Sequence, residues 1–146
     1  MKSFIIFLLL LVSTNIFSQQ GTSFKPVTPY SPVVQAGNTF YLSGQIPRVP
    51  ETGKLVRGDI QKATEQVMKN IGVILRKYGM DYHHIVKCTV YLKNMDDYAV
   101  MNKAYVTFFK DRFPARVAVQ VARIPLDADI EISCIAVKKE IKIKME

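Results

Sequence analysis

Two charged residues in the C-terminal part of the chain have types and spacing suited to carboxylate chemistry. Arg116 follows a Phe-Pro-Ala segment at residues 113–115, so it stands at the start of a predicted strand directly after a predicted helix. A planar guanidinium there can bind a carboxylate through two parallel hydrogen bonds. Fifteen residues later, Glu131 lies between two isoleucines and needs either solvent or a positive partner. Arg116, on the preceding strand, is its natural candidate partner, and such a pair is a structural salt bridge about as often as a site.

A serine at the end of a predicted strand lacks the partners of a hydrolase. Ser43 is followed by Gly44 and Gln45, which is not a Gly-x-Ser-x-Gly elbow. No histidine stands where a catalytic triad would need one. A serine at a strand end more often hydrogen-bonds the backbone, so the sequence argues against a serine hydrolase.

The cysteines and histidines give no metal-binding signature. His83 and His84 are adjacent and have no further Cys or His ligands at metal-binding spacing. Cys88 and Cys134 fall in two different predicted strands, and no neighbour in sequence would activate either as a nucleophile. They are buried free thiols or, in an oxidising compartment, a disulfide if their Cα atoms come within about 7 Å. We therefore expect no metal site.

The predicted elements that position these residues follow the order ββαβαββ in one continuous domain. Asp59 is a predicted N-cap for the first helix, whose apolar residues recur at three- and four-residue steps until Gly79. The second helix begins at Asp96 or Asp97 and ends at the Phe-Pro pair of residues 113–114. β-Prone runs bounded by turn residues predict strands over residues 33–36, 39–43, 85–92, 116–121 and 130–138.

Length and composition bound the classes of protein. With 146 residues, 49% of them apolar and 22% charged, the chain fits one domain and excludes a two-domain enzyme. Its net charge is +8, and the densest basic group is the tail with Lys138, Lys139, Lys142 and Lys144. No arginine-rich stripe interleaved with aromatic residues accompanies this tail, so we expect no nucleic-acid partner.

The first eighteen residues have the pattern of an export signal. Lys2 precedes an apolar run over residues 4–12, and a polar stretch then leads to the small residue Ser18. The apolar run is too short to span a bilayer. We therefore predict a cleaved signal at 1–18, a mature domain at 19–146, a periplasmic or secreted location, and no membrane contact after cleavage.

Six short motifs, in the appropriate order and spacing, resemble the Rid (reactive intermediate deaminase) family, also called YjgF-like proteins. They lie at residues 29–32 (Pro-Tyr-Ser-Pro), 43–46 (Ser-Gly-Gln-Ile), 85–92 (Ile-Val-Lys-Cys-Thr-Val-Tyr-Leu), 113–116 (Phe-Pro-Ala-Arg), 121–125 (Val-Ala-Arg-Ile-Pro) and 130–132 (Ile-Glu-Ile). The resemblance extends from about residue 24 to residue 138, which is nearly the whole predicted mature chain.

The resemblance implies an α+β, chorismate-mutase-like fold with a mixed sheet and two helices on one face. It also implies a homotrimer with ligand clefts between neighbouring subunits. The activity it implies is hydrolysis of enamine and imine acids of the 2-iminobutanoate and 2-iminopropanoate type to 2-oxo acids and ammonia. No metal or organic cofactor is implied.

The resemblance also assigns roles to residues. Arg116 matches the arginine that binds the substrate carboxylate, and Glu131 matches the acid that positions or activates the attacking water. Ala118 stands where the family often has a cysteine and would act through its backbone. The remaining positions that match the cleft lining are Tyr30, Ser43 and Gly44.

The predicted location leaves alternatives open, because the family's reactive imines arise from cytoplasmic enzymes. The second hypothesis is a non-catalytic binding module for small carboxylates that uses the same Arg116 cleft outside the cytoplasm. The third is the endoribonuclease or translation-inhibitor activity attributed to some relatives.

Overall fold

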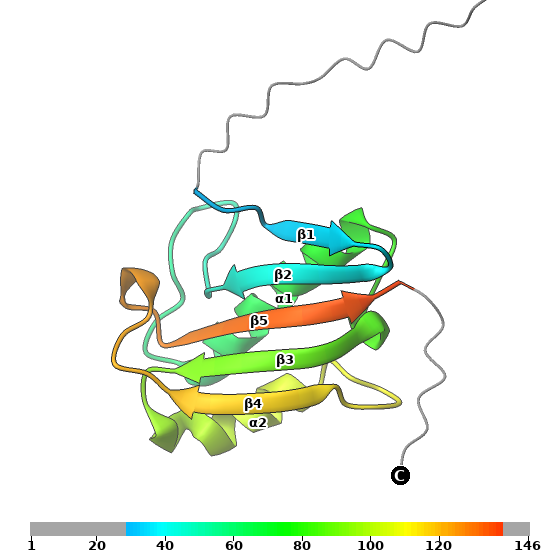
Figure 1. The fold of residues 1–146 in the computed structure, drawn as a ribbon. Helices are drawn as coiled ribbons and strands as arrows, with labels where there is room; N and C mark the ends of the chain where they lie inside the picture. The colour runs from blue at the N-terminus through cyan, green and yellow to red at the C-terminus, as the bar shows by residue number, and fades with distance from the viewer. Residues whose placement is uncertain (1–28, 139–146) are drawn as a thin grey trace, which may run out of the picture.

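A computed structural model describes residues 29–138 of the protein. These residues form a five-stranded sheet with two α-helices packed on one of its faces (Figure 1). The predicted signal at residues 1–18 and the lysines beyond Lys138 lie outside the described residues. Within residues 29–138, no helix is long and apolar enough to cross a membrane.

The observed elements follow the predicted order. In chain order they are β1 (Val33–Ala36), β2 (Thr39–Gln45), α1 (Ile60–Lys77), the 3₁₀ turn η1 (Tyr82–His84), β3 (Ile85–Leu92), the 3₁₀ turn η2 (Met95–Asp97), α2 (Tyr98–Val106), β4 (Ala115–Gln120), the 3₁₀ turn η3 (Pro125–Asp127) and β5 (Ile130–Val137).

The strands are arranged in the order β1-β2-β5-β3-β4, which places the last strand of the chain in the centre of the sheet (Figure 1). β3 and β4 run parallel, with α2 between them in sequence, and the other three pairs are antiparallel. β4 and β5 follow one another in sequence but are not neighbours, because β3 lies between them.

The first helix begins and ends where its sequence predicts. The Asp59 side chain accepts a hydrogen bond of 3.0 Å from the backbone N–H of Lys62, as an N-cap does. At the other end Gly79 has a φ of +69°, a conformation that glycine adopts without a steric penalty. The N–H groups of Gly79 and Met80 donate to the last carbonyls of the helix, at Arg76 and Leu75, which is a Schellman motif.

The second helix is shorter than predicted. α2 ends at Val106, and the N–H groups of Phe108 and Phe109 donate three residues back, in turns that follow the helix. The Thr107 hydroxyl donates to the carbonyl of Ala104 at 2.7 Å, which competes with continued helical hydrogen bonding. Asp97 precedes the helix but makes no capping hydrogen bond.

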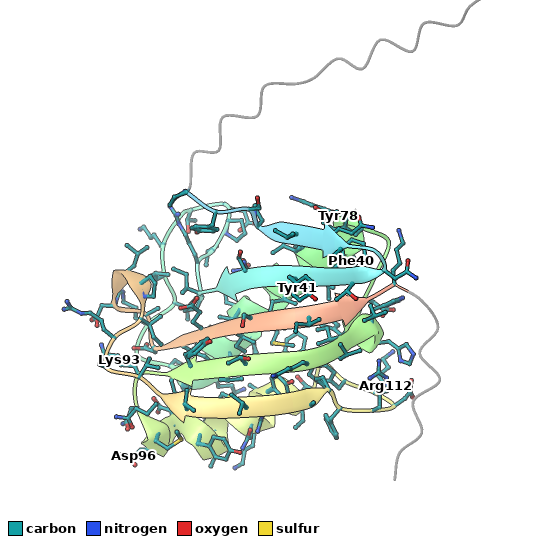
Figure 2. The ribbon with its side chains drawn as sticks, in the orientation of Figure 1. Phe40, Tyr41, Tyr78, Lys93, Asp96 and Arg112 are labelled. Atoms are coloured by element: carbon teal, nitrogen blue, oxygen red, sulfur yellow. The ribbon has the colours of Figure 1, made fainter. Side chains whose placement is uncertain are left out.

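The two faces of the sheet differ sharply. On β5 the even-numbered residues, from Ile130 to Ala136, are buried against the helices, whereas the odd-numbered residues, from Glu131 to Val137, face the other side. On β2, Phe40 is buried with its ring 5.2 Å from the ring of Tyr78, while the neighbouring Tyr41 lies 48% exposed on the opposite face (Figure 2). No element within residues 29–138 covers this second face, which we call the open face (Figure 1).

Candidate functional site

Arg116 is held by two tyrosines of α2. Its partner across the parallel pair is Cys88, so its side chain lies on the helix-covered face of the sheet. One guanidinium nitrogen, Nη2, donates a 3.1 Å hydrogen bond to the Tyr98 hydroxyl. The guanidinium carbon also lies 4.8 Å from the ring centroid of Tyr105 and 5.6 Å from that of Tyr98, within the range of a cation–π interaction. Two aromatic rings thus restrict the orientation of the predicted carboxylate-binding group.

A hollow of about 390 Å³ opens beside this arginine. Its lining consists of Asn102, Tyr105, Val106, Phe113, Pro114 and Arg116. A cation among mostly apolar and aromatic walls is suited to an organic carboxylate, because the charge fixes the ligand and the walls exclude water. The hydrogen bond with Asn102 and the positive charge of Arg116 lower the pKa of the Tyr98 hydroxyl, whereas burial raises the pKa of Tyr105.

A second hollow, of about 330 Å³, is lined by four of the other predicted site residues. Tyr30, Ser43, Gly44 and Glu131 line it together with Ile46 and Pro125. The Ser43 hydroxyl donates to the backbone carbonyl of Ser31 at 2.7 Å, as expected of a serine at a strand end. This bond ties the segment that carries Tyr30 to β2, and the lone pairs of the Ser43 oxygen can still accept a hydrogen bond.

A β-bulge shapes this second hollow. Leu42 pairs with Cys134 and Gln45 pairs with Ile132, so the two residues between Leu42 and Gln45 oppose a single residue of β5. The Glu131 side chain crosses over one of these two residues, Gly44. A Cβ atom at Gly44 would lie only 2.7 Å from the Cδ of Glu131 and would overlap its carboxylate. Glycine at position 44 therefore allows the carboxylate to enter the hollow.

Glu131 is half-buried on the open face of the sheet. Among residues 29–138 it forms neither an ion pair nor a hydrogen bond through its carboxylate. Desolvation by burial therefore acts alone and raises the pKa of Glu131. A carboxyl group with a raised pKa is suited to proton transfer nearer to neutral pH.

The expected pairing of Arg116 with Glu131 is wrong within one chain. Arg116 lies opposite Cys88 and Glu131 lies opposite Tyr91, so β3 separates the two and their side chains emerge on opposite faces. Their Cα atoms are two strands apart across the sheet and three residues apart along the strands. Each of these separations is roughly 10 Å. The sequence-based expectation fails because β5 inserts beside β2 and not beside β4.

Ala118 lies on β4, two residues after Arg116 and on the same face. Its side chain packs against the hydrophobic core. Because β4 is an edge strand, half of its backbone hydrogen-bonding groups point away from β3. A role for Ala118 would therefore use its backbone.

Neither the two cysteines nor the two histidines line either hollow. Cys88 and Cys134 are buried free thiols. The His84 ring contacts the Asp81 carboxylate at 2.9 Å, while His83 is exposed beside a separate hollow of about 520 Å³. In the described part of the chain, no three His, Cys, Asp or Glu side chains cluster closely enough to hold a metal ion.

Comparisons with known sequences and solved structures indicate the family to which this chain belongs. The sequence profile of the family described as Endoribonuclease L-PSP matches residues 20–138. A RutC family protein of Pyrococcus horikoshii is 49% identical over 115 residues, which cover 79% of this chain and 91% of that protein. The chain belongs to the Rid/YjgF family.

Two further relatives carry informative names. The Mus musculus protein named 2-iminobutanoate/2-iminopropanoate deaminase is 42% identical to this Rid chain over 112 residues, which cover 77% of the chain and 83% of that protein. The crystal structure of RidA from an Antarctic Psychrobacter bacterium matches with a TM-score of 0.73 at 39% identity, covering 77% of this chain and 90% of that one. The expected family and α+β fold are thereby confirmed.

Three residues of this Rid chain that surround Arg116 were not singled out as site residues from the sequence. Tyr98, Asn102 and Tyr105 project from α2 toward the arginine or line its hollow. The available signal was their spacing, because residues four and three apart share one face of a helix. A sequence pattern does not distinguish an aromatic side chain that packs in the core from one that supports a charged group.

Proposed function

We propose that this Rid protein hydrolyses reactive 2-imino acids, and their enamine tautomers, of the 2-iminobutanoate and 2-iminopropanoate type to 2-oxo acids and ammonia. The observation that carries this proposal is the fixed guanidinium of Arg116 beside a hollow of small-ligand size. Support also comes from relatives named imine deaminases at above 40% identity. The imine itself is strongly electrophilic, so binding and orientation supply much of what catalysis needs.

In the proposed reaction Arg116 binds the substrate carboxylate through two hydrogen bonds. Glu131 orients a water molecule and accepts its proton as the water oxygen bonds to the imine carbon. The nitrogen takes up a proton to form a carbinolamine. Collapse of this intermediate breaks the carbon–nitrogen bond, so that one water is consumed and one ammonia and one 2-oxo acid are released.

The proposal requires a second copy of the chain. Arg116 and Glu131 lie on opposite faces of one sheet, so a single subunit does not present both to one small ligand. We propose a homotrimer in which the open face packs against neighbouring subunits and brings the Arg116 hollow of one to the Glu131 hollow of the next. The exposed apolar side chains on this face, among them Val34, Tyr41, Val117 and Val119, support such packing.

The test is direct assay of the mature protein with freshly generated 2-iminopropanoate. An amino-acid oxidase produces the imine, and semicarbazide traps what has not been hydrolysed. We expect wild type to suppress trapping and Arg116→Ala to lower kcat/KM by at least about 100-fold, because the carboxylate is no longer held. Arg76→Ala, which removes one exposed arginine from α1 outside both hollows, is the matched control.

Other outcomes would reject the deaminase. Equal activity of Arg116→Ala and wild type would contradict the assigned role of the arginine. Binding of 2-oxo acids without turnover would instead identify a carboxylate-binding module. Salt-sensitive cleavage of RNA in place of imine hydrolysis would favour the endoribonuclease alternative.

We also propose that the protein acts outside the cytoplasm, on the basis of its N-terminal sequence pattern. The intact mass of the protein from its native host is expected to correspond to a chain that begins after Ser18. A mass that retains residues 1–18 would contradict this.

A further inference from the structure

Two thiols meet in the core, one of them on the strand next to the site arginine. Cys88 on β3 and Cys134 on β5 are partners across the antiparallel pair, and their Sγ atoms lie 3.2 Å apart. Their side chains are 0% and 3% exposed. They are the only two cysteines of the chain, so neither has another intramolecular partner.

The backbone already has the spacing that a disulfide requires. Residues directly opposite each other on antiparallel strands have Cα atoms about 4.5 to 5.5 Å apart. That range falls within the Cα separations of about 4.4 to 6.8 Å seen across disulfides. Closing the bond needs the two sulfur atoms to approach by only about 1.2 Å, from contact to covalent distance.

The surroundings favour one thiol as the nucleophile. The hydrogen bond with Cys134 lowers the pKa of Cys88, the positive charge of Arg116 acts in the same direction, and burial opposes both. The same contact and burial raise the pKa of Cys134. Cys88 therefore reaches the reactive thiolate form more readily, and Cys134 is positioned to attack whatever forms on it.

We propose that Cys88 and Cys134 form a redox modification site, at which a small peroxide oxidises the thiol pair to an intramolecular disulfide. The Cys88 thiolate attacks one peroxide oxygen, the oxygen–oxygen bond breaks, and hydroxide leaves and takes up a proton as water. The Cys134 sulfur then displaces hydroxide from the resulting sulfenic acid. Two thiols and one hydrogen peroxide thus give one disulfide and two waters.

The burial of both thiols limits which oxidants can reach them. Thiol–disulfide exchange would require a bulky partner to reach a sulfur atom that is fully enclosed. Hydrogen peroxide has only two heavy atoms and carries no charge, so it can reach the pair through small fluctuations of the core. We expect hydrogen peroxide to form the disulfide and oxidised glutathione to leave the folded protein unchanged.

The experiment exposes the folded protein to hydrogen peroxide, removes the oxidant with catalase, and then denatures and alkylates it with iodoacetamide. Cysteine-containing peptides are read by mass spectrometry, because the chain also has six methionines that peroxide oxidises. We expect a Cys88–Cys134 cross-linked peptide that resists alkylation and disappears on treatment with dithiothreitol. The protein should remain a single chain on a non-reducing gel.

Cys134→Ala and Cys88→Ala are the matched variants. In Cys134→Ala, the Cys88 sulfenic acid has no second thiol to react with, so dimedone should trap it. The mass of this variant should not fall by that of two hydrogen atoms, because no disulfide forms. In wild type, recovery of both thiols as alkylated peptides after peroxide treatment, or their conversion to sulfinic acids without a cross-link, would overturn the proposal. This experiment detects a covalent bond and requires only the wild-type protein. Its outcome therefore does not depend on whether the protein has the proposed deaminase activity.

Discussion

At the scale of single residues, the site depends on how each charged group is held. Arg116 is oriented by a hydrogen bond and two aromatic rings, whereas Glu131 is half-buried and has no ion-pair partner within residues 29–138. The guanidinium is thus fixed for binding. The carboxyl group is instead poised to exchange a proton.

Tyr98→Phe tests the first of these contacts. The substitution keeps the aromatic ring near Arg116 but removes the hydroxyl that accepts its 3.1 Å hydrogen bond. Loss of one such exposed hydrogen bond, which positions the arginine, should raise KM by about 3- to 10-fold and change kcat little. Tyr78→Phe, which alters a tyrosine packed on Phe40, is the control. Equal KM values for both variants would show that the rings alone position Arg116.

Glu131→Gln tests the proton transfer. Burial raises the pKa of Glu131 above its ordinary value of 4.5, so the carboxylate form that accepts a proton is lost as the pH falls through that raised value. In wild type, kcat should therefore decline on the acid side at a higher pH than an exposed carboxyl group would give. In the variant, kcat should be at least about 10-fold lower and this acid limb should disappear. An unchanged pH profile would assign the limb to another group.

At the scale of elements, the approach of β2 to β5 decides where the carboxylate lies. The bulge at Ser43 and Gly44 places the backbone of Gly44, which has no side chain, against the side chain of Glu131. Gly44→Ala should therefore displace the carboxylate, lower kcat, and cost about 1 to 3 kcal/mol of the free energy of unfolding through overpacking.

A double-mutant cycle isolates this contact. In the Glu131→Ala background the obstructing carboxylate is absent, so adding Gly44→Ala should have a much smaller effect on the free energy of unfolding. Chemical denaturation of the four proteins measures the difference. Equal costs in both backgrounds would mean that the glycine serves the backbone conformation of the bulge instead.

At the scale of the whole molecule, the separation of Arg116 from Glu131 predicts complementation between defective subunits. Arg116→Ala and Glu131→Ala should each be inactive alone. The two variants are denatured together and refolded, so that their subunits assort at random in the proposed homotrimer. About a quarter of the sites should then combine an intact Arg116 from one subunit with an intact Glu131 from the next, which should restore about a quarter of the wild-type activity. Trimers that mix wild type with the double variant serve as the reference. No recovery, with trimers confirmed by light scattering, would contradict a shared site.

Much of this architecture follows from local sequence. Asp59 and Gly79 bound the first helix, alternating residues define β5, and the Phe-Pro-Ala segment places Arg116 at the start of a strand. These signals are local because caps, turns and side-chain alternation depend on neighbours within a few residues. The shortened α2 is an exception, since the same aromatic residues pack equally well from a helix or from turns.

What the sequence by itself determined was the family and the order of elements, together with a first set of candidate site residues that did not include Tyr98, Asn102 and Tyr105. Only the tertiary structure decided which of them lie together, because strand order is set by long-range pairing that local pattern does not encode. Insertion of β5 beside β2 and β3 separated Arg116 from Glu131 and brought Cys88 against Cys134. The same pairing register thus divided the expected site and created the thiol pair.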